Sequence, residues 1–121
     1  MRQVLIDEGV PHPLRDWIAD ADVFSVQWMG WAGIKNGELI KRINDHPFDV
    51  VITSDQQWSY QQNRNKWRFG VIELSTHSLP VLMQAAKNDN FIARLNDAVC
   101  SVAVGAIIEL VVENVNGRDE K

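Results

Sequence analysis

The chain has 121 residues, of which 45% are hydrophobic, so it can build one domain with a single core and has no room for a second. Its net charge of -4 argues against a strongly basic nucleic-acid binder, although a local cationic patch is compatible with it. No apolar run reaches the length of a membrane span, so we expect no membrane partner. The chain has a single cysteine, Cys100, which excludes an intramolecular disulfide; we therefore expect a cytoplasmic protein in which this thiol is buried.

A β-α-β unit is predicted at the start of the chain. Residues 3–7 read as a strand, and the two prolines within residues 9–13 suit a turn that opens a helix, because proline is tolerated in a first helical turn. This helix is expected to run to about Asp20. Residues 21–26 include several apolar side chains and predict a short second strand.

The next segment changes from loop to helix. Residues 28–37 contain three glycines and two tryptophans, a composition that favours an ordered loop over a long helix or strand. From Asn36 or Gly37 to about His46 the apolar positions recur at helical spacing. Asn36 is a candidate N-cap, and Glu38 falls in the first turn, where a carboxylate is favourable.

The central strand is predicted at residues 48–55. Its apolar run of valines and isoleucine is typical of a parallel strand buried on both faces, and it ends abruptly at Asp55. The first strand also ends in acids, at Asp7 and Glu8. Because open parallel sheets place their chemistry at the carboxyl ends of the strands, we expect Asp7 and Asp55 to meet at this carboxyl edge.

The rest of the chain predicts a polar, partly helical segment at 56–66, strands at 69–74 and 106–112, and helices at 78–88 and 90–102.

Strands and helices thus alternate along the chain. This order predicts an α/β fold of three layers, with a central, mainly parallel β-sheet of about five strands flanked by helices. We expect residues 1–113 to form a single domain and the polar residues 114–121 to be a frayed tail.

Three acids are candidates for metal binding and catalysis: Asp7, Glu38 and Asp55. Carboxylates at adjacent strand ends suit Mg2+ or Mn2+, which prefer oxygen ligands. Such a cation could polarise a phosphodiester and lower the pKa of an attacking water. The alternative is that all three are ordinary solvated or capping acids.

Two further polar side chains could contact a substrate near this edge. His12 could bind a phosphate or transfer a proton, but a surface histidine at a helix start is the favoured interpretation. Ser54 lacks the Gly-x-Ser-x-Gly surroundings of a nucleophile, so a hydrogen bond to substrate or to Asp55 is favoured.

A basic and aromatic segment follows the central strand. Its side chains could stack unpaired bases and hold phosphates, as surfaces for single-stranded nucleic acid do; they are Trp58, Tyr60, Arg64, Lys66, Trp67 and Arg68. In the competing interpretation Trp17 and Trp67 belong to the core, whereas Trp28, Trp31 and Trp58 shape a loop or a protein interface.

Three motifs, in this order, resemble the small PIN-like proteins, which are related to PIN-domain ribonucleases including VapC-type toxins. They are L-I-D-E-G-V-P at 5–11, G-W-A-G-I-K-N-G-E-L at 30–39, and D-V-V-I-T-S-D at 49–55 with Y-Q-Q-N at 60–63. The resemblance implies a compact α/β fold, acids at the carboxyl edge, and RNA cleavage that depends on Mg2+ or Mn2+. By position, Asp7 and Asp55 match the first and third acid motifs, and Glu8 beside the first is expected to contact substrate.

Two positions depart from the family pattern. Relatives commonly have an aspartate where this chain has Asn36, which leaves Glu38 two residues further on, and another acid where it has Gln57. An amide brings no charge, so metal affinity is expected to be lower.

The resemblance therefore predicts a metal-dependent ribonuclease that acts on single-stranded or structured RNA, in the manner of a toxin restrained by an antitoxin protein. Asp7 and Asp55 would hold the metal, and Glu38 would be a ligand or orient water. The substrate site would be shaped by Asn36, Gln57, Tyr60 and Gln61, with Arg64 and Lys66 on phosphates. The alternatives are a catalytically weakened PIN-like module that binds RNA or a partner protein, and a structural homodimer.

Overall fold

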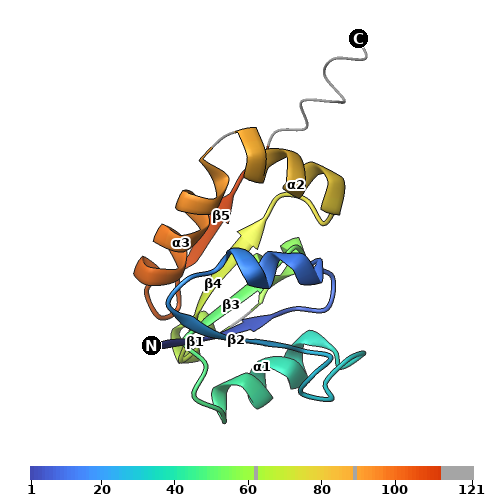
Figure 1. Ribbon diagram of the computed structural model, residues 1–121. Helices are drawn as coiled ribbons and strands as arrows, with labels where there is room; N and C mark the ends of the chain where they lie inside the picture. The colour runs from blue at the N-terminus through green and yellow to red at the C-terminus, as the bar shows by residue number, and fades with distance from the viewer. Residues whose placement is uncertain (62, 89, 113–121) are drawn as a thin grey trace.

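The computed structural model describes residues 1–61, 63–88 and 90–112. A five-stranded sheet forms the centre of the protein (Figure 1). Its strand order is β2-β1-β3-β4-β5, and every neighbouring pair is parallel. The strands are β1 (Arg2–Ile6), β2 (Ala21–Ser25), β3 (Val50–Thr53), β4 (Gly70–Leu74) and β5 (Ile107–Leu110). All five predicted strands are confirmed, and the sheet is wholly rather than mainly parallel. Residue 113 and the predicted tail 114–121 lie outside the described residues.

Helices cover both faces of this sheet. One face carries the α-helix α1, and the other carries α2 and α3 (Figure 1) together with the 3-10 helix η1. Two further 3-10 helices, η2 and η3, follow β3. Their bounds are α1 (Asn36–Asn44), α2 (Leu79–Asn88), α3 (Phe91–Ser101), η1 (His12–Trp17), η2 (Gln56–Tyr60) and η3 (Arg64–Lys66). The three-layer α/β fold is confirmed, and the partly helical segment after β3 consists of two 3-10 turns.

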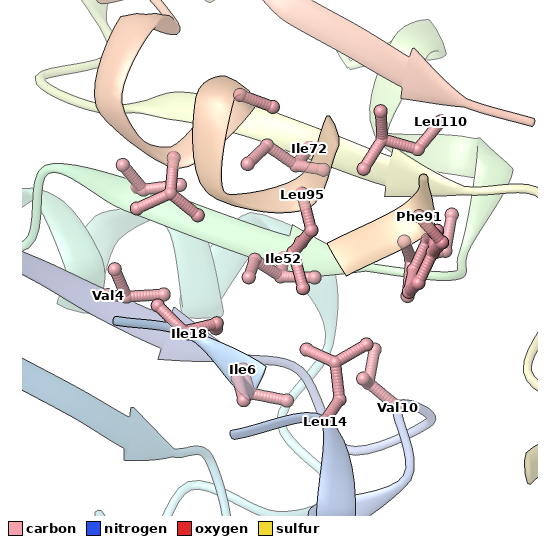
Figure 2. Packing of buried hydrophobic residues seen from close by; sticks show 14 of the residues in the cluster. Val4, Ile6, Val10, Leu14, Ile18, Ile52, Ile72, Phe91, Leu95 and Leu110 are labelled. Atoms are coloured by element: carbon pink, nitrogen blue, oxygen red, sulfur yellow. The ribbon is translucent and has the colours of Figure 1, made fainter. Parts of the chain in front are cut away.

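The alternation of side chains along each strand divides the core into two clusters. On the α3 face, Ile52 of β3 and Ile72 of β4 belong to the same cluster as Leu95 and Phe91 (Figure 2). The neighbouring strand positions, such as Val51, point to the α1 face. Both central strands are buried along their whole length, which explains why their sequences read as continuous apolar runs.

The α1 face is rich in aromatic rings. Trp58 is fully buried there, in edge contact with Trp67 at 5.9 Å between ring centroids, and Trp67 stacks on Phe69 at 5.2 Å. Trp31 is also buried, whereas Trp28 is 73% exposed. The expectations that Trp58 stacks bases or lies at an interface are therefore wrong, because the chain turns at η2 and directs this ring into the core.

The buried stripe of α3 contains Phe91, Leu95, Ala98 and Val99, in which the other three residues each lie three or four positions from Leu95. Cys100 lies beyond this stripe and is exposed, so the expectation of a buried thiol is wrong. Within the described residues, no helix is both long and apolar enough to cross a membrane.

Candidate active site at the carboxyl edge of the sheet

A row of polar side chains crosses the sheet at its carboxyl edge. Thr53 is the register partner of Glu73, and Glu73 is the partner of Glu109. Asp7 follows β1, and extending the β1–β3 register by one residue places it beside Thr53. Because alternate residues of a strand share a face, this row lies on the same face as Val51, the face covered by α1.

The Thr53 hydroxyl links the two aspartates. Its Oγ1 donates to Asp7 Oδ2 at 2.8 Å and accepts from the Asp55 backbone N–H at 3.0 Å. Thr53 is fully buried, so both hydrogen bonds are fixed by the strand. The other oxygen of Asp7, Oδ1, accepts from the backbone N–H of Glu8 at 2.9 Å. The Thr53 hydroxyl thus joins the Asp7 carboxylate to the backbone of Asp55, and the meeting of the two carboxylates stays a prediction.

Asp55 is oriented by two amides. It is the N-cap of η2, where its Oδ1 accepts from the Gln57 backbone N–H at 2.9 Å, while Oδ2 accepts from Asn36 Nδ2 at 3.4 Å. The residue at the N-cap of α1 is Lys35, so the prediction that Asn36 caps this helix is wrong. Asn36 lies in the first turn of α1 instead and directs its side chain toward Asp55.

Glu73 is a further acid of this edge that the sequence reasoning missed. It is 6% exposed, and no donor in the described residues reaches its Oε2. Desolvation raises the pKa of Glu73, and the negative charges of Glu109 and Asp55 raise it further. The available signal was a glutamate inside an otherwise apolar strand, because glutamate is rarely buried without a partner.

Glu38 is not hydrogen-bonded to either aspartate. Its carboxylate pairs with Arg42 one turn further along α1, at 3.2 Å, and its side chain is 54% exposed. In the described part of the chain, no group of three or more histidine, cysteine and acidic side chains is close enough to hold a metal ion. The role of Glu38 as a third ligand stays a prediction.

The remaining residues predicted near this edge support its loops. Glu8 Oε1 accepts from the Gly33 backbone N–H at 2.9 Å and so holds the loop before α1. The Ser54 hydroxyl lies against Gly9, where a Cβ would come within 3.2 Å of Oγ. A side chain at position 9 would therefore press on Ser54. His12 is exposed as the first residue of η1.

The basic and aromatic residues of the sequence prediction divide into two groups. Arg64 is partly buried, lies over the Trp67 ring at 5.7 Å and donates to the Gly105 carbonyl oxygen at 3.2 Å, so it ties η3 to the segment before β5. Tyr60 and Lys66 are exposed. Among the described residues, Lys66 and Arg68 are the predicted phosphate-binding cations whose side chains are exposed and make no such structural contact.

The donor set at this edge fits a hard divalent cation. Asp7 is partly exposed and Asp55 is exposed, and each of their carboxylate oxygens accepts one hydrogen bond from the described part of the chain, which leaves lone pairs available. Mg2+ is usually bound by one or two carboxylates together with waters and substrate phosphates, so a pair of aspartates is sufficient.

No family model, no curated protein and no solved structure matches this chain. The resemblance to PIN-like proteins therefore depends on the sequence motifs alone. The function has to be inferred from the site.

Proposed function

We propose that this protein is an endoribonuclease that depends on Mg2+ or Mn2+, with Asp7 and Asp55 as the residues that hold the cation. The observation that carries the proposal is the Thr53 hydroxyl, which donates to Asp7 and accepts from the Asp55 backbone. The Asp7 carboxylate is thereby tied to the backbone that carries Asp55, at the edge of a parallel sheet where such folds place their reactions. A cation bound there would polarise a phosphodiester and lower the pKa of an attacking water.

The residues around the two aspartates orient them without neutralising them. Within residues 1–61, 63–88 and 90–112, every donor to the carboxylates of Asp7 and Asp55 is an uncharged hydroxyl, amide or backbone N–H. Glu73 lies on the same edge and adds to the negative potential when it is ionised. A phosphodiester is itself anionic and would be repelled by this arrangement, so the edge favours substrate binding through a cation.

The assignment to RNA and the partners of the protein come from the resemblance. Lys66 and Tyr60 are the exposed residues that would bind RNA, and Glu38 would act as a ligand or orient water if its ion pair with Arg42 opens. In a toxin-antitoxin pair this chain would be the toxin. The exposed Trp28, in ring contact with Phe24 of the edge strand β2, offers an apolar surface for an antitoxin or for a second copy of the chain.

A second candidate is a PIN-like module with weakened catalysis that binds RNA or a partner protein. It is favoured by the engagement of Glu38 with Arg42 and by the lack of a third acid within metal-binding distance in the described residues. Titration calorimetry with Mn2+ separates the two candidates. Binding at up to millimolar metal supports the nuclease, whereas no heat of binding favours the module.

The direct test is cleavage of single-stranded RNA by an Asp55→Asn variant in Mn2+. Loss of this carboxylate should lower the cleavage rate by at least about 100-fold, because cation stabilisation contributes several kcal/mol and each 1.4 kcal/mol is a factor of about ten. Asp97→Asn is the matched control, since Asp97 is an exposed acid on α3 in the opposite layer. Circular dichroism should show both variants folded. Cleavage by Asp55→Asn at the wild-type rate would eliminate the proposed mechanism.

A further inference from the structure

An open groove of about 700 Å3 runs along α1, from Gly37 in its first turn to Asp45 at its C-terminal end, and lies between this helix and the η2–η3 segment. Three cationic side chains line it: Lys41, Lys66 and Arg68. A single carboxylate, Asp45, is also part of the lining. The groove is therefore locally cationic on a chain whose net charge is -4.

These three cations are free to bind a ligand. All three residues are exposed, and none forms an ion pair with a carboxylate of the described residues, where the one recorded ion pair joins Arg42 and Glu38. Their number and freedom match what a chain of phosphates requires, since exposed Lys and Arg side chains supply most of the affinity for a polyanion.

The two walls of the groove are held in fixed positions, because Asn44 on one wall hydrogen-bonds to the backbone of the other. From the last turn of α1, Asn44 Oδ1 accepts from the Arg68 backbone N–H at 3.0 Å, and its Nδ2 donates to the Lys66 carbonyl oxygen at 3.5 Å. The wall that carries two of the three cations is thus fixed to the helix that carries the third, Lys41.

An exposed aromatic ring stands at the same groove. Tyr60 is 82% exposed, although it is separated from the fully buried Trp58 by only one residue. Trp58 anchors η2 in the core, so the tyrosine ring is presented to solvent from a fixed base. Exposed rings beside cations are the means by which proteins hold unpaired bases. Gln61 and Asn63 add amide groups that can hydrogen-bond to base edges.

The groove is continuous with the acidic edge. Gly37, which lines it, directly follows Asn36, whose side chain bonds Asp55. Tyr60 is the last residue of η2, the 3-10 helix that begins directly after Asp55. A rise of about 2 Å per residue places the backbone of Tyr60 about 10 Å from that of Asp55, which is the length of about three stacked nucleotides.

We propose that this groove binds a single-stranded polynucleotide, with phosphates at Lys41, Lys66 and Arg68 and a base stacked on Tyr60, and that it leads the strand toward Asp55. The proposal deepens the proposed function by naming where and how the strand is held, and it rests on that function for the direction of the strand. An acidic peptide would use the cations but would leave the tyrosine ring and the amides without a role.

The test is the affinity of the full-length protein for a fluorescein-labelled oligo(U) ten-mer, measured by anisotropy in EDTA so that no cleavage occurs. Lys66→Ala/Arg68→Ala should weaken binding at least about tenfold and reduce the slope of log K against log salt by about 1.4, at roughly 0.7 per phosphate contact in a single strand. Lys87→Ala/Arg15→Ala is the charge-matched control, because both residues are exposed on the opposite layer.

A second pair of variants tests the stacked base. Tyr60→Ala should lower affinity about tenfold, and Tyr60→Phe, which keeps the ring, should bind nearly as the wild type does. Binding that is unchanged in both the double variant and Tyr60→Ala would overturn the proposal. So would displacement of the oligonucleotide by poly-glutamate at equal charge concentration, because a simple polyanion or acidic-peptide site would then suffice.

The binding assay is independent of the proposed reaction. If Asp55→Asn fails to abolish cleavage while the groove variants lose affinity, the groove stands and the catalytic assignment falls. The reverse result refutes the groove and leaves the catalytic assignment in place. Tighter binding of oligo(U) than of oligo(dT) would identify RNA as the ligand, and equal binding would extend the site to both sugars.

Discussion

Replacing Thr53 with valine is the sharpest test of how the two aspartates are held. The substitution keeps the shape and the β-branched backbone preference of a fully buried strand residue. It removes the hydroxyl that donates to Asp7 Oδ2 at 2.8 Å and accepts from the Asp55 N–H at 3.0 Å. The variant therefore isolates the link between the aspartates from the packing of the strand.

The expected cost follows from these two hydrogen bonds. A hydrogen bond to a charged group contributes about 1.5 to 3 kcal/mol, and a neutral one about 0.5 to 1.5 kcal/mol. Asp7 is only half-buried, so water can replace part of the lost donor, and we expect a net loss of about 2 kcal/mol in the free energy of unfolding. For a domain of this length, that loss lowers Tm by about 6 to 8 °C.

Urea unfolding followed by circular dichroism measures this loss, and cleavage of single-stranded RNA in Mn2+ measures its functional counterpart. Cleavage should fall about 10- to 100-fold, as it does when groups that orient metal ligands are removed. Thr53→Ser is the control, because it keeps the hydroxyl and loses one buried methyl group, at about 1 kcal/mol. Equal cleavage by the valine and serine variants would refute the role given to the hydroxyl.

Two further predictions concern the inner strand β4. Because burial and the charges of Glu109 and Asp55 raise the pKa of Glu73 above its ordinary value of 4.5, the free energy of unfolding should fall as pH rises from 4.5 through the raised pKa. Glu73→Gln should remove this fall and be more stable than wild type at pH 7 in urea unfolding; an unchanged pH profile would contradict it. Gly70→Ala should lower the free energy of unfolding by about 1 to 3 kcal/mol, since its Cβ would lie 2.6 Å from the Ala103 carbonyl oxygen. An unchanged Tm in a thermal melt would contradict this prediction and show that the backbone at Ala103 can move away.

The fold was largely predictable because parallel strands that are buried on both faces appear in the sequence as short, continuous apolar runs. The run within β3 and the acids after β1 and β3 predicted the sheet and the position of Asp7 and Asp55. The reason is physical: strands that run in one direction bring their carboxyl ends to one edge whatever their order. Strand order and register, which make Thr53 the neighbour of Glu73, depend on contacts distant in sequence and could not be predicted.

The errors have a common origin in side-chain direction. Asn36 could have been an N-cap by residue type, but it is already inside the helix and points to Asp55 instead. Trp58 follows a polar strand end and could have faced solvent, yet the 3-10 turn of η2 rotates it into the core. Composition predicts the kind of segment, whereas the direction of a side chain such as Asn36 or Trp58 depends on one or two backbone dihedral angles.

The contrast between Glu38 and the two aspartates bears on whether a pair of acids is enough to bind a divalent cation. The charge of Glu38 is compensated by Arg42 at 3.2 Å, so this acid has little need of a cation. Asp7 and Asp55 are held only by uncharged donors, and Glu73 beside them lacks a donor to Oε2 in the described residues. The negative charge at the carboxyl edge is thus oriented but left uncompensated. If Asp7 and Asp55 hold a divalent cation as proposed, we expect it to bind more tightly than to two isolated carboxylates, because it would also relieve the repulsion among the neighbouring acids.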